Sequence, residues 1–96
     1  MSFSFHPEAY QELLSTIDYY ESIQSGLGIR FVKEIFSTIE RILRYPEAAQ
    51  QLSQNSRRCL VNKFPIGLIY QIHDGDILII AIAHLNRKPG FWENRD

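Results

Sequence analysis

Apolar residues recur at helical spacing over two stretches in the first half of the chain. In the first, residues 8–24, intervals of four, four and three residues align Ala9, Leu13, Ile17 and Tyr20 on one face. In the second, residues 29–44, a similar stripe is formed by Phe31 or Val32, Ile35, Ile39 and Ile42 or Leu43. Pro7 suits the first turn of a helix, where its missing N–H would have no helical partner. Because only Ser25 to Gly28 separates the two stripes, the pattern predicts an antiparallel helical hairpin.

The remaining apolar segments are short and are typical of strands. Residues 2–5 alternate polar and aromatic side chains, which predicts a strand with Phe3 and Phe5 on one face. Three further strands are expected over residues 58–63, 67–73 and 77–84. The polar stretch 47–56 is expected to be a loop. Asp74-Gly75 favours a tight hairpin between the last two strands, because both central residues of such a turn need positive φ.

This order of elements predicts an α+β fold of the form β-α-α-β-β-β. The helical hairpin is expected to pack on one face of a small, mostly antiparallel sheet. The last strand, 77–84, is apolar on both faces, which favours a central position in that sheet. The chain has 96 residues, of which 45% are hydrophobic and 22% charged. This composition excludes a disordered chain and predicts a single domain over residues 1–96.

Cysteine and histidine usage points to a reducing compartment. Cys59 is the only cysteine, so no disulfide can form within the chain, and a cytoplasmic location is expected. The three histidines show no ligand spacing with it, so we expect no metal and no cofactor. The longest apolar run, Ile77 to Ala83, is far shorter than the roughly 20 residues that cross a bilayer. We therefore expect no membrane association.

Charge is distributed unevenly along the chain. Residues 1–56 carry four basic and seven acidic side chains, a net charge of −3. Residues 57–96 carry six basic and four acidic side chains, a net charge of +2. An anionic partner is therefore expected to dock on the C-terminal half. The excess is too small to predict tight non-specific binding to nucleic acid, whose affinity grows with the number of phosphates neutralised.

Several basic side chains are expected at the end of the last strand. In a three-strand meander, Lys63, Phe64, His84 and Arg87 belong at one end of the sheet and Arg58 at the other. A lysine, a histidine and an arginine together could cleave an RNA phosphodiester without a metal, by proton transfer and charge stabilisation. Lys63, His84 and Arg87 are therefore the candidate catalytic residues. A histidine that closes an apolar strand is more often a packing residue, and this alternative stays open.

Two aromatic residues follow this basic group. Phe91 and Trp92 could stack on a base or cap the end of the sheet. Four acidic residues of the first predicted helix are interpreted as solvated surface, namely Glu8, Glu12, Asp18 and Glu21.

Taken with the predicted fold, these motifs resemble those of the RelE/ParE superfamily of bacterial toxins from type II toxin-antitoxin modules, on the ParE-like side. The resemblance covers nearly the whole chain. Its most specific parts are Phe64-Pro65-Ile66-Gly67-Leu68-Ile69-Tyr70, Asp74-Gly75-Asp76 and His84-Leu85-Asn86-Arg87-Lys88-Pro89-Gly90-Phe91-Trp92. The last segment is similar to the family's His-x-x-Arg-x-Pro-x-aromatic-Trp ending.

The resemblance implies a growth-inhibiting toxin, of a kind linked to plasmid stabilisation, that a small antitoxin neutralises. ParE-like members act against DNA gyrase, whereas RelE-like members cleave messenger RNA on the ribosome with basic residues matching Arg58, Lys63 and Arg87. A gyrase-directed toxin is the first hypothesis, and a ribosome-dependent endoribonuclease is the alternative. A third is a non-toxic module that only binds the antitoxin. Whether the protein is an enzyme stays open. Residues expected to bind the target or the antitoxin are Arg58, Arg87, Lys88, Phe91 and Trp92, and a homodimer or a hetero-oligomer with the antitoxin is expected.

Overall fold

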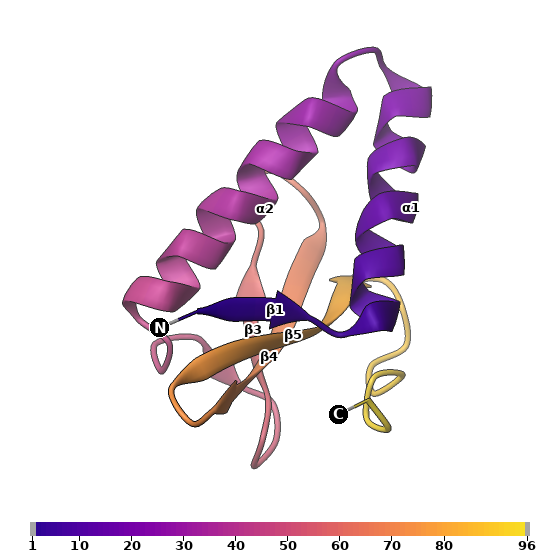
Figure 1. The fold of residues 1–96 in the computed structure, drawn as a ribbon. Coiled ribbons are helices and arrows are strands. Elements are labelled where there is room, and N and C mark those ends of the chain that lie inside the picture. The colour runs from indigo at the N-terminus through magenta and orange to yellow at the C-terminus, as the bar shows by residue number, and fades with distance from the viewer. Residues whose placement is uncertain (1, 96) are drawn as a thin grey trace.

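Two helices and five strands make up residues 2–95, the part of the chain that the computed structural model describes. In chain order they are β1 (Phe3–Phe5), α1 (Pro7–Ile23), α2 (Leu27–Arg44), β2 (Gln50–Gln51), β3 (Arg57–Leu60), β4 (Ile66–His73) and β5 (Asp76–His84). Figure 1 shows the two helices as a hairpin standing over the sheet. The predicted α+β order is confirmed, with one addition. β2 lies in the stretch predicted to be a loop, because a two-residue strand of glutamines has no hydrophobic alternation to reveal it.

The turn between the helices is held by a side chain from α1. Glu21 accepts hydrogen bonds from the backbone N–H groups of Gly26 and Gly28. Gly26 has φ of +88°, a conformation that glycine adopts without strain. At Gly28 a Cβ would lie 3.0 Å from the carbonyl oxygen of Ile17, so glycine lets the two helices approach closely. As a result α2 begins at Leu27, two residues before the predicted start.

The sheet has the strand order β1-β5-β4-β3-β2. β1 pairs parallel with β5, and the other neighbours are antiparallel. β5 therefore lies inside the sheet, as its two apolar faces predicted. Asp74 and Gly75 both have positive φ, which confirms the tight β4–β5 turn. A register shift between Ile69 and Tyr70 leaves Ile80 as an extra residue in β5.

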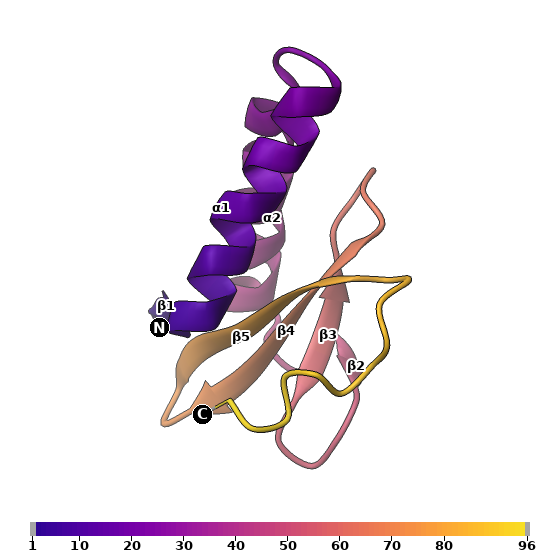
Figure 2. The ribbon, with the colours of Figure 1, turned by 90° about the vertical axis from the view of Figure 1, so that its right-hand side faces the viewer.

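Both faces of the sheet are covered. The helices cover one face, where the largest cluster of buried side chains includes Phe31, Ile39 and Leu68. On the opposite face, Trp92 packs against a second cluster, whose buried members are Ile69, Ile80, Ala81 and Ala83. Figure 2 shows the C-terminal segment, in yellow, turning back across the sheet on the side away from the helices. No helix within residues 2–95 is both long enough and apolar enough to cross a membrane.

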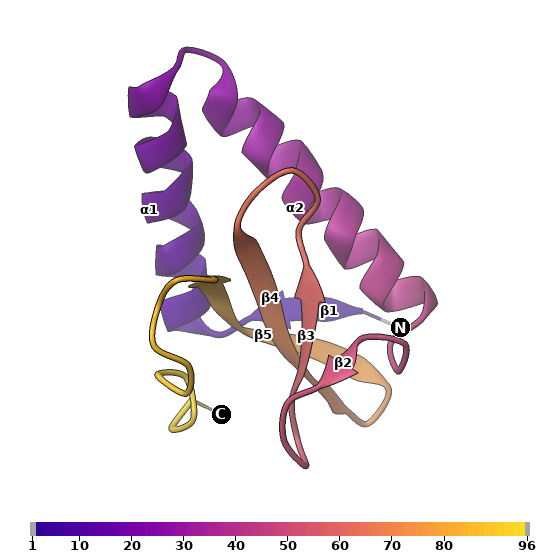
Figure 3. The same cartoon turned by 180° about the vertical axis from the view of Figure 1, so that it is seen from behind.

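The tip of the β3–β4 connection inserts an aromatic ring between the helices. The Phe64 ring lies 4.8 Å from that of Tyr20 on α1 and 5.1 Å from that of Phe31 on α2, centroid to centroid. Figure 3 shows this connection rising in front of the helical hairpin. The three rings meet edge to face or tilted, which are favourable geometries for aromatic pairs. They join the tip of the sheet to both helices.

The hydrogen bonds of the helix turn indicate that the contribution of Glu21 to the stability of the protein depends on pH. Its hydrogen bonds from the Gly26 and Gly28 N–H groups lower the pKa of the Glu21 carboxyl. Stability from a carboxylate with a lowered pKa is present above its unfolded pKa, about 4.3, and is lost as the pH falls through the folded value. Glu21→Gln is therefore expected to reduce the urea midpoint at pH 7, and the difference from the wild type should shrink below about pH 4.

Glu40→Gln, at an exposed carboxylate of α2, provides the control and should leave the midpoint nearly unchanged at both pH values. If the urea midpoint of Glu21→Gln is lower than that of the wild type by the same amount at pH 7 and at pH 3, the prediction is contradicted.

Candidate functional site

The second half of β5 has an edge that no strand covers. β1 pairs with β5 only from Ile77 to Ile79. Beyond that point two side chains take the place of a strand. The Ile82 N–H donates a hydrogen bond of 3.1 Å to Glu12 Oε1, and Arg95 Nη1 donates one of 3.0 Å to the Ile80 carbonyl. Backbone groups at a buried edge need partners, and here a carboxylate and a guanidinium supply them.

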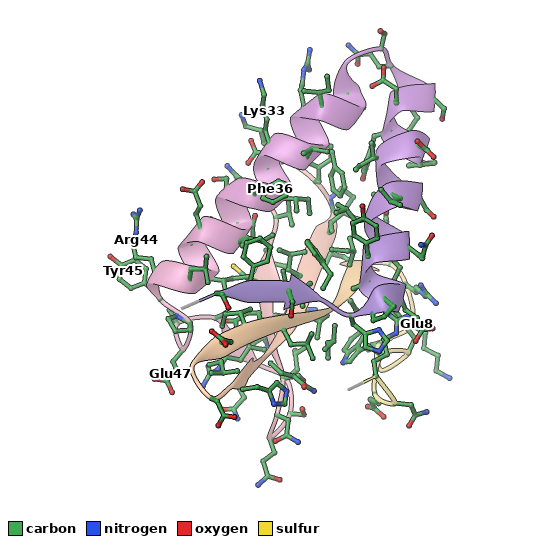
Figure 4. All side chains as sticks on the ribbon, in the orientation of Figure 1. Glu8, Lys33, Phe36, Arg44, Tyr45 and Glu47 are labelled. Atoms are coloured by element: carbon green, nitrogen blue, oxygen red, sulfur yellow. The ribbon has the colours of Figure 1, made fainter. Side chains whose placement is uncertain are left out.

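Glu12 and Arg95 also bind each other in a forked geometry. Arg95 Nη1 and Nη2 lie 2.8 and 2.9 Å from the two carboxylate oxygens of Glu12. Arg95 Nε lies 3.4 Å from a Glu8 oxygen. Figure 4 shows Glu8 at the start of α1, beside the C-terminal segment. The hydrogen bonds that Arg95 donates to the Glu12 carboxylate raise the pKa of the Arg95 guanidinium, against the effect of burial. Only 9% of Arg95 is exposed, so this pair fixes the end of the chain.

The interpretation of the acidic residues of α1 as solvated surface is therefore wrong for Glu12. Glu8 and Glu21 do lie on the surface, although Glu21 also holds the helix turn and Glu8 pairs with Arg95. Helical periodicity shows which face a residue occupies but not which distant segment meets that face. The partner of Glu12 lies 83 residues away along the chain.

Residues 85–95, which follow β5, form a tail that Arg95 anchors, and several of its side chains stack on one another. The guanidinium carbon of Arg87 lies 3.6 Å from the centre of the Phe91 ring, which stands edge to face with Trp92. Arg87 Nη1 also lies 3.6 Å from Glu12 Oε2. Trp92 is 9% exposed and covers the sheet, so of its two predicted roles the capping role is the observed one. Arg87 keeps about half of its side-chain surface exposed.

A hollow of about 450 Å³ opens between α1 and the end of β5. His84, Arg87 and Glu12 line it, together with the apolar side chains of Tyr20 and Ile82. His84 Nδ1 accepts a hydrogen bond from the Asn86 N–H, so one ring nitrogen shapes the turn that follows β5. The hollow therefore joins a cation and an imidazole to an apolar floor.

Lys63 lies at the same end of the sheet but not in this hollow. The register pairs Ile66 with His84, which places the β3–β4 connection beside the end of β5, as predicted. The Lys63 ammonium, however, lies 3.9 Å from Glu34 on α2 and lines a different hollow, and Tyr20 lines both. The three predicted catalytic residues thus share one end of the sheet without facing one common space.

Arg58 lies closer to this end than expected. A Cβ placed on Gly67 would come within 2.9 Å of Arg58 Cγ and 3.8 Å of Leu85 Cδ2. The aliphatic part of Arg58 therefore lies across β4, on the face away from the helices, while its Nη2 donates to Gln50 Oε1. The placement of Arg58 at the opposite end is wrong because β3 has only four residues and Gly67 leaves room for the side chain to cross. Lys88 is exposed in the tail.

The arrangement suits recognition of a partner. Within residues 2–95, no three histidine, cysteine, aspartate or glutamate side chains gather in a way that could hold a metal ion. The tail instead presents a guanidinium, an aromatic ring and an exposed lysine on a rigid support. Sequence reasoning missed Glu12, Tyr20 and Arg95 as parts of this site. The position of Arg95 shortly after the basic and aromatic segment was the one signal of its role.

The fold defines a small α+β protein in which a helical hairpin covers one face of a five-strand mixed sheet. The chain belongs to the ParE toxin family, because residues 3–89 match the family model described as "ParE toxin of type II toxin-antitoxin system, parDE". It is similar in fold to a solved structure, "Chromosomal ParDE TA system from P. aeruginosa", with a TM-score of 0.74 and 16% identity. That match covers 90% of this chain and 97% of the other. No curated protein matches the chain.

The Glu12–Arg95 pair predicts strong coupling between α1 and the tail. Glu12→Ala is expected to reduce the free energy of unfolding by about 3 kcal/mol, because it leaves a buried guanidinium and the Ile82 N–H without their acceptor. Arg95→Ala should cost a similar amount. The double variant should cost less than the sum by about 1–3 kcal/mol, measured by urea denaturation.

The control is the Lys63–Glu34 pair, in which Lys63 is largely exposed and the two charges are 3.9 Å apart. A double-mutant cycle of alanine substitutions at this pair is expected to give a coupling below about 1 kcal/mol. Additive effects of the Glu12 and Arg95 substitutions would contradict the strand-replacing role.

The packing of Arg58 over β4 predicts the effect of a methyl group at Gly67. Gly67→Ala is expected to destabilise the protein by about 1–3 kcal/mol, because the new Cβ would overlap the Arg58 side chain. In an Arg58→Ala background the same substitution should cost less than half as much. Thermal unfolding of the four proteins measures both values, and an equal cost in both backgrounds would show that Arg58 does not occupy this space.

Proposed function

We propose that this protein is a growth-inhibiting toxin that acts on DNA gyrase in the cytoplasm and is held silent by a small antitoxin. Membership of the ParE family carries the proposal. The resemblance of the His84-to-Trp92 segment to the ParE-like ending supports gyrase as the target. The proposed mechanism is binding without a cofactor, in which the target meets the tail that Glu12 and Arg95 anchor.

The exposed part of this tail has the chemistry of a protein-binding surface. Arg87 and Lys88 provide positive charge, and the partly buried Phe91 supports the Arg87 guanidinium from below. Arginine and aromatic residues are enriched among the side chains that dominate binding energy at protein interfaces. Arg58 lies near Leu85 on the same face of the sheet and extends the positive surface.

Exposed apolar side chains on the helical hairpin support the antitoxin part of the proposal. Tyr10 and Leu14 on α1, with Ile29 and Phe36 on α2, are each at least 40% exposed. Figure 4 shows Phe36 on the outer part of α2. Apolar surface of this kind is typical of an interface with an amphipathic segment. We propose that it is covered in a hetero-oligomer with the antitoxin, and a homodimer would use the same surface.

A ribosome-dependent endoribonuclease is the second candidate. The observation in its favour is that His84 and Arg87 line one hollow, where an imidazole could transfer a proton beside a cation. Two observations count against it: Arg87 lies 3.6 Å from the Glu12 carboxylate, and Lys63 lies 3.9 Å from Glu34 and outside this hollow. A non-toxic antitoxin-binding module is the third candidate.

Gyrase inhibition is testable with purified components. The wild-type protein is expected to inhibit supercoiling of relaxed plasmid at amounts stoichiometric with gyrase. Arg87→Ala should weaken this inhibition about tenfold, because an arginine side chain at the centre of an interface often contributes binding energy of this size. Arg44→Ala, at an exposed arginine at the far end of α2, is the matched control and should inhibit like the wild type.

Supercoiling that is untouched at excess protein would contradict the gyrase proposal. New transcript 5′ ends after induction that vanish in Arg87→Ala would establish the endoribonuclease in its place. Normal growth on induction without an antitoxin, with soluble and folded protein, would support the non-toxic module.

A further inference from the structure

A second hollow lies at the tip of the helical hairpin, on the other side of Tyr20 from the hollow that His84 lines. It has a volume of about 440 Å³. Leu27 of α2 and Phe64 and Pro65 of the β3–β4 connection line it together with Tyr20. The rings of Tyr20 and Phe64 are held against Phe31 in the aromatic cluster described above, so the floor is apolar and rigid.

The rim of this hollow is strongly basic. Three cations line it, Arg30 and Lys33 from α2 and Lys63 from the β3–β4 connection. Glu34 is the one carboxylate among the described lining residues, and it lies 3.9 Å from Lys63. The rim therefore keeps an excess of two positive charges.

The backbone places Lys63 at this rim under strain. Lys63 has φ of +70°, a left-handed conformation that costs a residue with a side chain about 1 kcal/mol. Asn or Gly would adopt this turn position more readily. In this protein Lys63 occupies the turn position. Its side chain lines the hollow, and its ammonium faces Glu34 of α2. Residues held in such conformations gather at functional sites.

We propose that this hollow binds an acidic segment of a partner protein that inserts one bulky apolar side chain. The apolar floor would receive the side chain, and flanking carboxylates would pair with Arg30, Lys33 and Lys63. This inference rests on the proposed function, under which the segment belongs to the antitoxin. It assigns Lys63 to recognition of that partner, in place of the catalytic role considered from the sequence.

Charge and ring geometry favour a protein segment over a nucleic acid. Tyr20 is 8% exposed and meets Phe64 edge to face, so neither ring offers the open, flat surface on which bases stack. A carboxylate side chain can instead approach Arg30 and Lys33 individually while its neighbour fills the apolar floor.

The test uses two synthetic fluorescein-labelled peptides with the same Leu-Phe centre, one flanked by glutamates and one by lysines. Binding to the purified full-length protein is measured by fluorescence anisotropy. The acidic peptide is expected to bind at least tenfold more tightly than the basic one, and less tightly in 300 mM than in 50 mM NaCl, because salt screens the rim at about the 10 Å scale. The triple variant R30Q/K33Q/K63Q should lose this preference.

Lys33→Gln and Arg44→Gln form a matched pair, since both remove one exposed cation from α2. Figure 4 shows Lys33 in the half of α2 near the hairpin tip and Arg44 at the opposite end. Lys33→Gln is expected to weaken binding of the acidic peptide about threefold, and Arg44→Gln should leave it unchanged, as expected for contacts that act only over short range. Circular dichroism melting confirms that each variant is folded.

Three results would overturn the inference. Equal binding of both peptides would show that the rim does not select charge. Tighter, rim-dependent binding of a single-stranded RNA oligonucleotide would identify a nucleic-acid site. Self-association that the triple variant abolishes, without peptide binding, would identify a second copy of the chain as the occupant.

A separate measurement distinguishes this inference from the proposed function. The protein encoded by the neighbouring reading frame is purified and titrated against the wild type and the triple variant. Equal affinity for both would retain the antitoxin pairing and overturn the role of the rim. Absence of binding, while the acidic peptide still binds through the rim, would support the hollow and contradict the antitoxin part of the proposed function.

Discussion

The unequal lengths of β1 and β5 set a constraint on the rest of the structure. β1 has three residues and β5 has nine, so most of one β5 edge has no strand beside it. Glu12 and Arg95 fill part of this gap, the first accepting from the Ile82 N–H and the second donating to the Ile80 carbonyl. Since each residue also binds the other, one ion pair joins the first helix, the central strand and the end of the chain. A further strand in this position would have excluded α1 from the edge of the sheet.

The position of the tail follows from this pair. With Arg95 held at the β5 edge, the preceding residues cross the face of the sheet away from the helices, and Trp92 covers the apolar cluster there. A central strand that is apolar on both faces needs such a cover, because a bare apolar face would be exposed to water. The same crossing leaves Arg87 on top of Phe91 at the surface. The part of the tail that stabilises the sheet and the part that stays exposed are therefore adjacent but distinct.

Tyr20 divides the basic end of the molecule into two hollows. Arg87 and His84 line one, and Lys63 lines the other with two cations of α2. Each cation from the connections faces an acidic residue of a different helix, Glu12 for Arg87 and Glu34 for Lys63. Cations paired in this way are better suited to two separate recognition surfaces than to one catalytic cluster, in which several uncompensated charges would have to converge on one phosphate.

Local pattern in the sequence determined the helical hairpin, the Asp74-Gly75 turn and the central position of β5, because periodicity and turn chemistry act over a few neighbouring residues. It also placed Lys63 and His84 at one end of the sheet. The tertiary structure alone decided that Glu12 meets Arg95, that Arg58 crosses Gly67 and that Lys63 turns toward α2. These contacts join residues far apart in the chain. They depend on where β1 ends beside β5 and on the space that Gly67 leaves for the Arg58 side chain. The physical reason is that an unpaired backbone edge, or the space above a glycine, exists only after the sheet has formed.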